Sequence, residues 1–273
     1  MLKVKVLVDN STLVGKYYTG EPGFCLWLDE SGKKILFDTG YSDIFIKNAV
    51  LMGIDPADAD TVVLSHGHSD HTWGLSHYAQ YMHSKGSAKR ARLIAHPLAL
   101  DIKRIDGAPA GITFSRETLE ENFMVTLSSE PLKITDKLMW LGTIPHTVEP
   151  EKALGKIVND GVETDDFCHD DSALVYEADG GIVIITGCSH SGICNIIAYA
   201  KRLTGKDKIL DVLGGFHMQN VPKEEMERTV DWLAQAAPVK MHPCHCTDFK
   251  ARAAIARRID VDEVGVGSEF CWE

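Results

Sequence analysis

Long apolar runs and an excess of positive charge are both absent from this sequence. No stretch approaches the roughly twenty apolar residues of a membrane span, so we expect no transmembrane helix. The formal net charge is −11, from 28 Lys and Arg against 39 Asp and Glu. Because phosphate binding needs a basic surface, this balance argues against nucleic acid as the main partner.

We also expect no disulfide framework, no leader and no interdomain linker. The seven cysteines are odd in number and unevenly spaced, which favours reduced thiols and a cytoplasmic location. Residues 1–8 alternate like a β-strand and do not resemble a signal peptide. No Pro/Gly/Ser linker or short repeat divides the 273 residues, 44% of which are hydrophobic. We therefore expect one domain over residues 1–273.

Strand and helix patterns alternate along the chain in two similar halves. The first half predicts strands at residues 4–8, 24–28, 34–37, 61–64 and 92–95, and helices at 43–52 and 72–84. The second half predicts strands at residues 173–177, 182–185 and 209–213, a short strand near 239, and helices at 192–203, 223–236 and 248–258. This alternation indicates a layered α/β fold, for which the pattern alone allows more than one arrangement.

The segment His66-Gly67-His68-Ser69-Asp70-His71 places three imidazoles and one carboxylate directly after the apolar run 61–64. These side chains are ligands for zinc and similar divalent ions. Four donors on one turn are too crowded for a single tetrahedral ion. The spacing favours two ions, one taking His66 and His68 and the other Asp70 and His71.

The pattern H-x-H-x-D-H after a strand resembles the metallo-β-lactamase superfamily of binuclear metallohydrolases. Phe37-Asp38-Thr39-Gly40 strengthens the likeness, which extends from about residue 3 to about residue 270. The phrases GCSHSGI, GGFH and PCHCT resemble one branch, whose members are often named after dihydropterin or dihydropteroate synthase-related proteins. The resemblance implies a four-layer αββα sandwich and two divalent ions. Zinc is the first choice, and iron and manganese are also compatible.

The resemblance implies further ligands in the second half of the chain. His190 and His245 are the candidates, because each follows a predicted strand. Cys188 stands where the superfamily usually has a bridging Asp. It is either a thiolate that binds or bridges the metals, or a small buried apolar residue. A competing interpretation is a structural zinc site formed by Cys188, His190, Cys244 and Cys246.

Three other side chains have weaker signals. His217 follows the strand predicted at 209–213, and we expect it to contact substrate or polarise the transition state. His146 is a lesser candidate for the superfamily's middle metal ligand. Asp38 is expected to orient an imidazole through the ring nitrogen that does not bind metal.

Residues 101–123 and 147–167 lack periodicity and carry loop residues. We expect them to be lids or substrate walls that decide substrate choice; the alternative is an insertion without a catalytic role. The basic residues at 89–92, together with Lys103 and Arg104, are expected on a solvated surface. A basic rim there could still steer an anionic small molecule.

Function follows from the expected metals. The leading hypothesis is a hydrolase that uses a metal-activated hydroxide on an ester, lactone, thioester or phosphodiester, with Asp70 both binding metal and orienting the nucleophile. The substrate is expected to be a small molecule, with an anionic one as an option. A metal-dependent transferase of pterin biosynthesis is the first alternative. An iron-containing redox or sensing protein is the second, although His68 replaces the carboxylate usual in such proteins.

Overall fold

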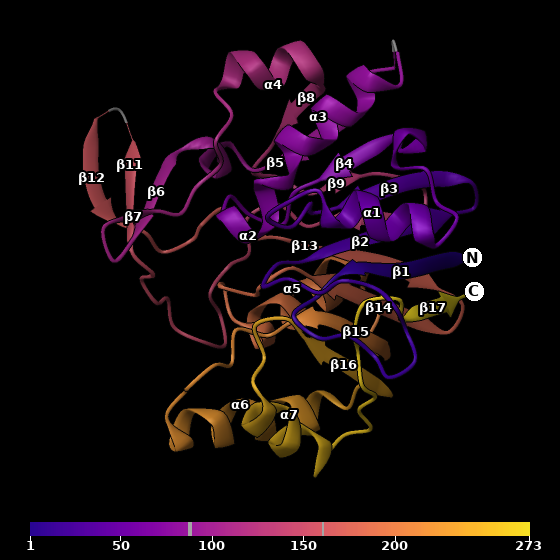
Figure 1. The fold of residues 1–273 in the computed structure, drawn as a ribbon. Helices are drawn as coiled ribbons and strands as arrows, with labels where there is room; N and C mark the ends of the chain where they lie inside the picture. Colours follow the sequence, from indigo (N-terminus) through magenta and orange to yellow (C-terminus); the bar gives the residue numbers. More distant parts are fainter. Residues whose placement is uncertain (87–88, 160) are drawn as a thin grey trace.

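Two large β-sheets face each other and carry helices on their outer sides in the computed structural model, which describes residues 1–86, 89–159 and 161–273 (Figure 1). The first sheet is built by the N-terminal half and closed by the C-terminal strand. In spatial order its strands are β17 (Glu269–Trp272), β1 (Leu2–Val8), β2 (Cys25–Glu30), β3 (Lys33–Phe37), β4 (Thr61–Val63), β5 (Arg92–Ala95) and β8 (Met124–Leu127). The strands β3, β4, β5 and β8 run parallel.

The second sheet comes from the later part of the chain. Its strands, in spatial order, are β16 (Lys240–Cys244), β15 (Ile209–Gly215), β14 (Gly181–Thr186), β13 (Ala173–Ala178), β10 (Leu138–Trp140) and β9 (Leu132–Lys133). All six residues of β14 are buried, as expected for a strand covered on both faces. Strands β14, β15 and β16 are parallel, so their carboxyl ends meet at one edge.

Helices complete four layers. Those on the first sheet are α1 (Ile44–Leu51), α3 (Gly74–Ser84) and α4 (Arg116–Asn122); those on the second are α5 (Ile193–Thr204), α6 (Lys223–Ala236) and α7 (Phe249–Ala256). One apolar cluster lies between the sheets, and one lies under the helices on each outer side. The predicted αββα sandwich is therefore confirmed.

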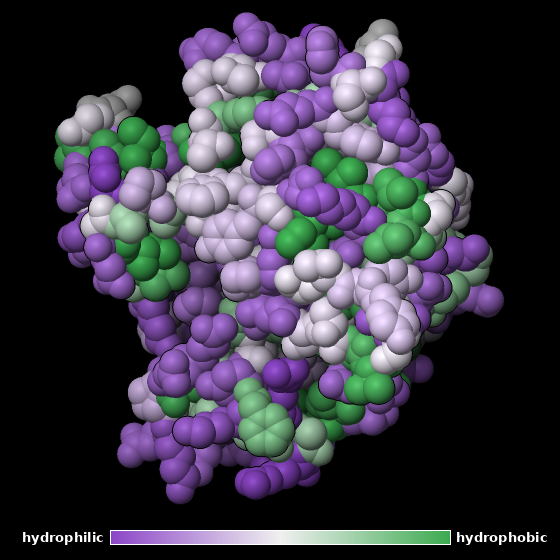
Figure 2. Space-filling model, in the orientation of Figure 1, coloured by the Kyte–Doolittle hydropathy of each residue, from purple (hydrophilic) through white to green (hydrophobic). Residues whose placement is uncertain are grey.

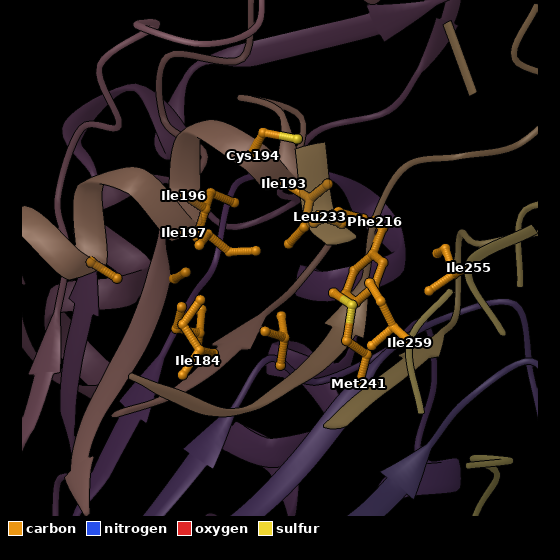
Figure 3. Close-up of a cluster of buried hydrophobic side chains, with 14 of the residues drawn as sticks. Ile184, Ile193, Cys194, Ile196, Ile197, Phe216, Leu233, Met241, Ile255 and Ile259 are labelled. Carbon is orange, nitrogen blue, oxygen red and sulfur yellow. The ribbon is translucent and has the colours of Figure 1, made fainter. Parts of the chain in front are cut away.

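The spacing of apolar residues explains how α5 attaches to the second sheet. Ile193, Ile196, Ile197 and Ala200 are buried at positions i, i+3, i+4 and i+7, which places them on one face of a helix. Figure 3 shows this face together with side chains from neighbouring elements. Gly205, with φ of +66°, ends the helix in the left-handed conformation that favours glycine.

The two stretches expected to be loops contain regular structure, so that prediction was wrong in part. Besides α4, they hold β6 (Ile102–Ile105), β7 (Ala108–Pro109), β11 (Lys156–Asn159) and β12 (Val162–Asp165). These strands form a third sheet in the order β12-β11-β6-β7, beside the sandwich (Figure 1). Each strand spans two to four residues, too few for a visible period, and β6 pairs with β11 from far along the chain.

Three local features also differ from the predictions. The helix predicted from residue 72 is preceded by a separate turn, α2 (Ser69–Thr72), so Asp70 and His71 lie inside a helix. Strand β17, which pairs with β1, was not predicted. Lys103, expected on the surface, is only 1% exposed, because two buried carboxylates surround its ammonium group.

The outer surface carries both hydrophobic and hydrophilic residues. Figure 2 shows hydrophobic residues in small separate patches among hydrophilic ones. Among the described residues, the helices are too short or too polar to pass through a bilayer.

Candidate metal centre

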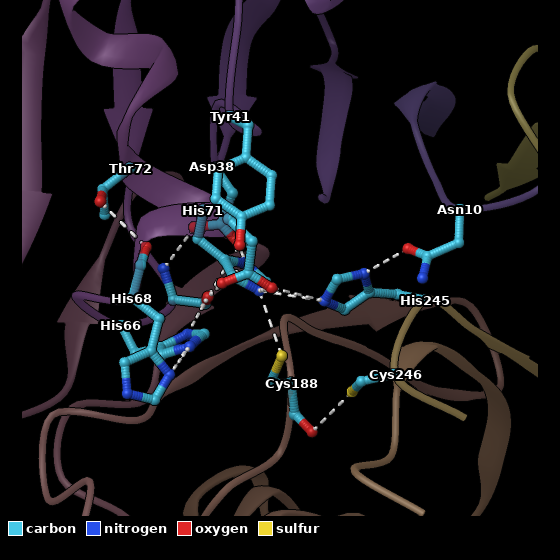
Figure 4. Close-up of polar contacts among 12 residues, drawn as sticks. Asn10, Asp38, Tyr41, His66, His68, His71, Thr72, Cys188, His245 and Cys246 are labelled. Atoms are coloured by element: carbon cyan, nitrogen blue, oxygen red, sulfur yellow. Dashed lines mark hydrogen bonds and ion pairs between the residues drawn. The ribbon is translucent and has the colours of Figure 1, made fainter. Parts of the chain in front are cut away.

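Loops that leave parallel strands bring the predicted ligands together. The cluster at 66–71 follows β4, Cys188 and His190 follow β14, and His245 follows β16. Because the carboxyl ends of parallel strands share an edge, the loops that follow them converge. Figure 4 shows side chains from both halves of the chain meeting there.

The backbone at this edge is tightly turned. Asp38, His217 and His245 have positive φ values of 58°, 48° and 50°, which are uncommon for residues other than glycine. Gly67 lies against the backbone of the next loop, where an added Cβ would stand 2.3 Å from the carbonyl oxygen of Ala99. The glycine between the two histidines is thus required by close packing.

The first donor cluster consists of three imidazoles. The Nδ1 atom of His68 lies 3.0 Å from His66 Nε2 and 3.1 Å from His190 Nε2, and the two Nε2 atoms are 3.2 Å apart. Nitrogen ligands at about 2.1 Å in a tetrahedron around zinc would lie about 3.4 Å from one another. The three nitrogen atoms therefore fit a common ion.

Burial also prepares these imidazoles to bind a cation. It lowers the pKa of His66 and of His190 well below the ordinary value, and it lowers the pKa of His68 to about 4. A neutral imidazole has one nitrogen lone pair free for a metal. All three side chains are therefore neutral at neutral pH.

The second donor cluster consists of Asp70, His71, Cys188 and His245, whose ligand atoms lie within 4.8 Å of one another. His71 Nε2 is 3.1 Å from Cys188 Sγ and 3.2 Å from His245 Nε2. Asp70 Oδ2 is 3.3 Å from His245 Nε2. The structure places Cys188 with this cluster, and the oxygen, nitrogen and sulfur donors together form a set that suits zinc.

Charge distinguishes this second cluster from the first. Burial alone would lower the pKa of His71, but the carboxylates of Asp70 and Asp38 outweigh it and hold that pKa well above its usual value. Burial raises the pKa of the Cys188 thiol. Without a metal, both side chains therefore keep a proton at neutral pH.

Hydrogen bonds fix the imidazoles of the second cluster from behind. Asp38 Oδ2 lies 2.7 Å from His71 Nδ1 and also accepts from the Ser65 hydroxyl at 2.7 Å. Asn10 Oδ1 lies 2.9 Å from His245 Nδ1. Both contacts leave Nε2 directed into the cluster, as carboxylates and amides behind metal-binding histidines do. The predicted contact of Asp38 with an imidazole is confirmed.

An ion-pair network lies behind the first cluster, and sequence reasoning missed it. Lys103 of β6 places its ammonium nitrogen 2.7 Å from Asp166 Oδ2 and 2.9 Å from Asp170 Oδ1. The other oxygen of Asp170 accepts the Gly67 N–H at 2.7 Å. The network thereby joins the third sheet to the loop that carries His66 and His68. Asp170 was noticeable in the sequence beside a second acid, but its pairing with Lys103 was not.

His217 lies beside the first cluster and outside both donor sets. Its ring centroid is 4.3 Å from that of His190. Burial lowers its pKa, and nearby His245 lowers it further. The side chain lines the pocket over the clusters, where a neutral imidazole can contact a bound molecule.

Two predicted alternatives are not supported by the positions of their residues. The nitrogen atoms of His146 are buried without a hydrogen-bond partner and belong to neither donor cluster. Among the described residues, no candidate cluster contains Cys188, His190, Cys244 and Cys246 together. Cys246 instead directs its thiol to the carbonyl oxygen of Cys188, at 3.4 Å.

A cavity of about 370 Å³ opens onto both clusters. Tyr41 and Gln219 line it beside the donors. Ile105 of β6 and Leu154, which precedes β11, also line it, so the third sheet supplies part of the wall. Figure 4 shows the Tyr41 ring reaching toward His71 and Cys188, a contribution that the sequence did not suggest.

Comparison with known proteins identifies the family to which this fold belongs. A sequence profile of the metallo-beta-lactamase superfamily matches residues 18–81. An uncharacterized protein of Methanocaldococcus jannaschii, MJ0448, is 32% identical over 255 residues, which cover 93% of this chain and 94% of that protein. The crystal structure of Tm1679, described as a metal-dependent hydrolase of the beta-lactamase superfamily, has a TM-score of 0.87 and 28% identity, with complete coverage of both chains. The chain belongs to the metallo-beta-lactamase superfamily.

A further relative is also from Methanocaldococcus jannaschii. It is named 7,8-dihydropterin-6-methyl-4-(beta-D-ribofuranosyl)-aminobenzene-5'-phosphate synthase and is 28% identical over 267 residues, covering 92% of this chain and 89% of that protein. The similarity to both relatives thus extends over nearly the whole chain.

Proposed function

We propose that this protein is a hydrolase that binds two divalent ions, zinc first among them, and cleaves an ester, lactone, thioester or phosphodiester in a small molecule. One observation carries the proposal: two adjacent donor clusters open onto the same cavity. The likeness to Tm1679, a named metal-dependent hydrolase, supports it. His66, His68 and His190 would hold one ion, and Asp70, His71, Cys188 and His245 the other.

Bound there, the two ions would supply hydroxide near neutral pH and polarise the carbonyl or phosphoryl group under attack. The protein's own side chains position the reacting groups. Asp70 lines the cavity, so its carboxylate can accept a hydrogen bond from the attacking water and orient it. His217 is neutral and reaches the same space, so its ring N–H can donate to the substrate.

The test compares metal content and turnover in the same preparations. Protein loaded with zinc, and separately with manganese or iron, is assayed on chromogenic esters, lactones, thioesters and phosphodiesters. We expect two ions per chain and turnover of at least one class. His66→Ala should lose metal from the first cluster and lose activity, because that cluster keeps only two imidazoles. His83→Ala, an exposed position on α3, serves as the control.

Two outcomes would contradict the proposal. One is His66→Ala protein that keeps full metal content and full turnover. The other is metal-loaded wild-type protein that cleaves no substrate of these four classes.

A second candidate, a metal-dependent transferase acting on a pterin, is favoured by the named synthase among the relatives. On this hypothesis the ions would activate a pyrophosphate leaving group on the pterin. Incubation of the metal-loaded protein with a pterin pyrophosphate and an aminobenzoate-type acceptor tests it. Condensed product would support the transferase, whereas hydrolysis in the first assay without condensation would support the hydrolase.

A further inference from the structure

Two further spaces lie beside the cavity over the donor clusters, on the far side of His190 and His217. A narrow space of about 50 Å³ shares these two residues with the main cavity. It also shares Glu149, Lys152 and Thr229 with a further cavity of about 190 Å³. The shared lining residues place the three spaces in a row that leads from the metal centre to α6.

The walls of the outer cavity are largely apolar. Val148, Pro150 and Cys194 line it from the segment after β10 and from the start of α5, and Trp232 lines it from α6. A Trp indole offers a flat face on which an aromatic ring can pack. The composition of this cavity therefore suits an aromatic ring.

Hydrogen bonds hold the segment at 147–149 in place. The side-chain oxygen of Asn195 accepts the backbone N–H groups of all three residues, at 2.7 to 3.1 Å. The carboxylate of Glu149 accepts from the Cys194 N–H at 3.0 Å and from the Thr229 hydroxyl at 3.1 Å. The carboxylate of Glu149 thus has hydrogen-bond partners within the cavity wall.

One positive charge at this cavity is left without a partner. Lys152 and Glu225 pair with each other. Within the part of the chain that the structure describes, Arg228 forms no hydrogen bond or ion pair. Arg228 and Trp232 are four residues apart on α6, so they lie on the same helix face and both line the cavity. The cavity combines a flat apolar wall with an unpaired guanidinium group.

We propose that this outer cavity binds the part of the substrate remote from the bond cleaved, and that this part is an aromatic ring carrying a negative charge. The ring packs against Trp232, and the anionic group pairs with Arg228. This assignment rests on the proposed hydrolase for the main site, because it names that enzyme's substrate class. It makes the segment at 147–152 and α6 the determinants of specificity.

The test uses metal-loaded protein and three 4-nitrophenyl esters: the acetate, a phenylacetate whose ring carries a sulfonate, and the same phenylacetate with a neutral sulfonamide. The shared leaving group keeps the chemical step comparable, so kcat/KM reports the remote group. We expect the sulfonate to be the best substrate and the acetate the poorest.

The variants separate the charge from the ring. Arg228→Ala should lower kcat/KM about fivefold for the sulfonate ester alone, as expected for one ion pair at an exposed arginine. Trp232→Leu should lower it about fivefold for both aromatic esters and leave the acetate unchanged. Arg257→Ala, which removes an exposed charge outside this cavity, should change none of the three. Equal losses on all three esters in Arg228→Ala, or no loss on the sulfonate, would overturn the proposal.

A binding measurement keeps this result separate from the proposed hydrolysis. Calorimetric titration with 4-sulfophenylacetate, the acid product, needs no turnover. Weaker binding to Arg228→Ala than to the wild type supports the cavity assignment even if no ester is cleaved, in which case only the hydrolase proposal fails. Equal binding to both proteins, or none to either, rejects the assignment whatever the hydrolysis assay gives.

Discussion

The two donor clusters stand side by side but differ in the protonation state of their donors. The first has three imidazoles that burial keeps neutral. The second has a carboxylate and a thiol among its donors, and His71 is held protonated by Asp70 and Asp38. A cation can enter the first without displacing a proton, whereas in the second it replaces protons already there.

The supports behind the clusters differ as well. The second rests on hydrogen bonds from Asp38 and Asn10 directly to its imidazoles. The first has one direct contact of this kind, between the Ser65 hydroxyl and His66 Nδ1 at 2.9 Å. It is also backed by the charged network of Lys103, Asp166 and Asp170, which holds the backbone at Gly67. The comparison indicates that docking of the third sheet matters more for the first cluster, and local orientation of the imidazoles more for the second.

The largest expected effect is the loss of stability when the charge of Lys103 is removed. Lys103→Met leaves two buried carboxylates without a cation, which should lower the free energy of unfolding by about 3–5 kcal/mol. Urea denaturation measures this loss. Arg104→Met is the control, because its ion pair with Glu163 is exposed, at 3.7 Å, and it should cost below about 1 kcal/mol. Equal stability of the two variants would show that Lys103 does not stabilise the fold in this way.

Replacement of the thiol tests the second cluster. Cys188→Ser should weaken one of two zinc-binding steps by more than about 100-fold and leave the other unchanged, since loss of a direct ligand exceeds the 10–100-fold typical of supporting residues. Competition with a chelator measures both steps. Cys271→Ser, at an exposed cysteine, is the control. A loss shared by both steps would instead mean that Cys188 bridges the ions.

A smaller effect is expected from the orienting carboxylate. Asp38→Asn weakens the contact that fixes His71 Nδ1, so zinc affinity of the second cluster should fall by about 10–100-fold. The first cluster should lose less affinity in the same competition, because Asp38 reaches it only through Ser65, whose hydroxyl lies 2.9 Å from His66 Nδ1. Asp43→Asn, at a partly exposed position, provides the matched control. Unchanged affinity in Asp38→Asn would show that packing alone orients the ring.

The pH dependence of zinc affinity should also differ between the two clusters. The pKa values of His71 and Cys188 are raised, so both groups must lose a proton when zinc binds at neutral pH. Affinity of the second cluster should therefore rise with pH, by up to about tenfold per unit for each proton released. The first cluster, with His68 near a pKa of about 4, should show little dependence above its titration range. Calorimetry in buffers of different ionisation enthalpy counts the protons, and equal counts for both steps would contradict the comparison.

Much of the fold and the centre could be predicted because the signals were local. Buried strands such as β14 are continuous apolar runs, and His66 to His71 are adjacent along the chain. Asp38 could be assigned because it follows a strand in a recognisable turn. The third sheet could not, since β6 and β11 are short and acquire their partners only through folding.

The sequence alone determined the layered architecture and the chemistry of the donors, because periodicity and residue type are properties of the chain itself. Tertiary structure decided which donors share a cluster: it placed His190 with His66 and His68, and Cys188 with Asp70 and His245. It also decided that Lys103 is buried as the counter-ion of Asp166 and Asp170. Distances of about 3 Å between residues more than a hundred positions apart arise only when the sheets pack and bring their strand ends to one edge.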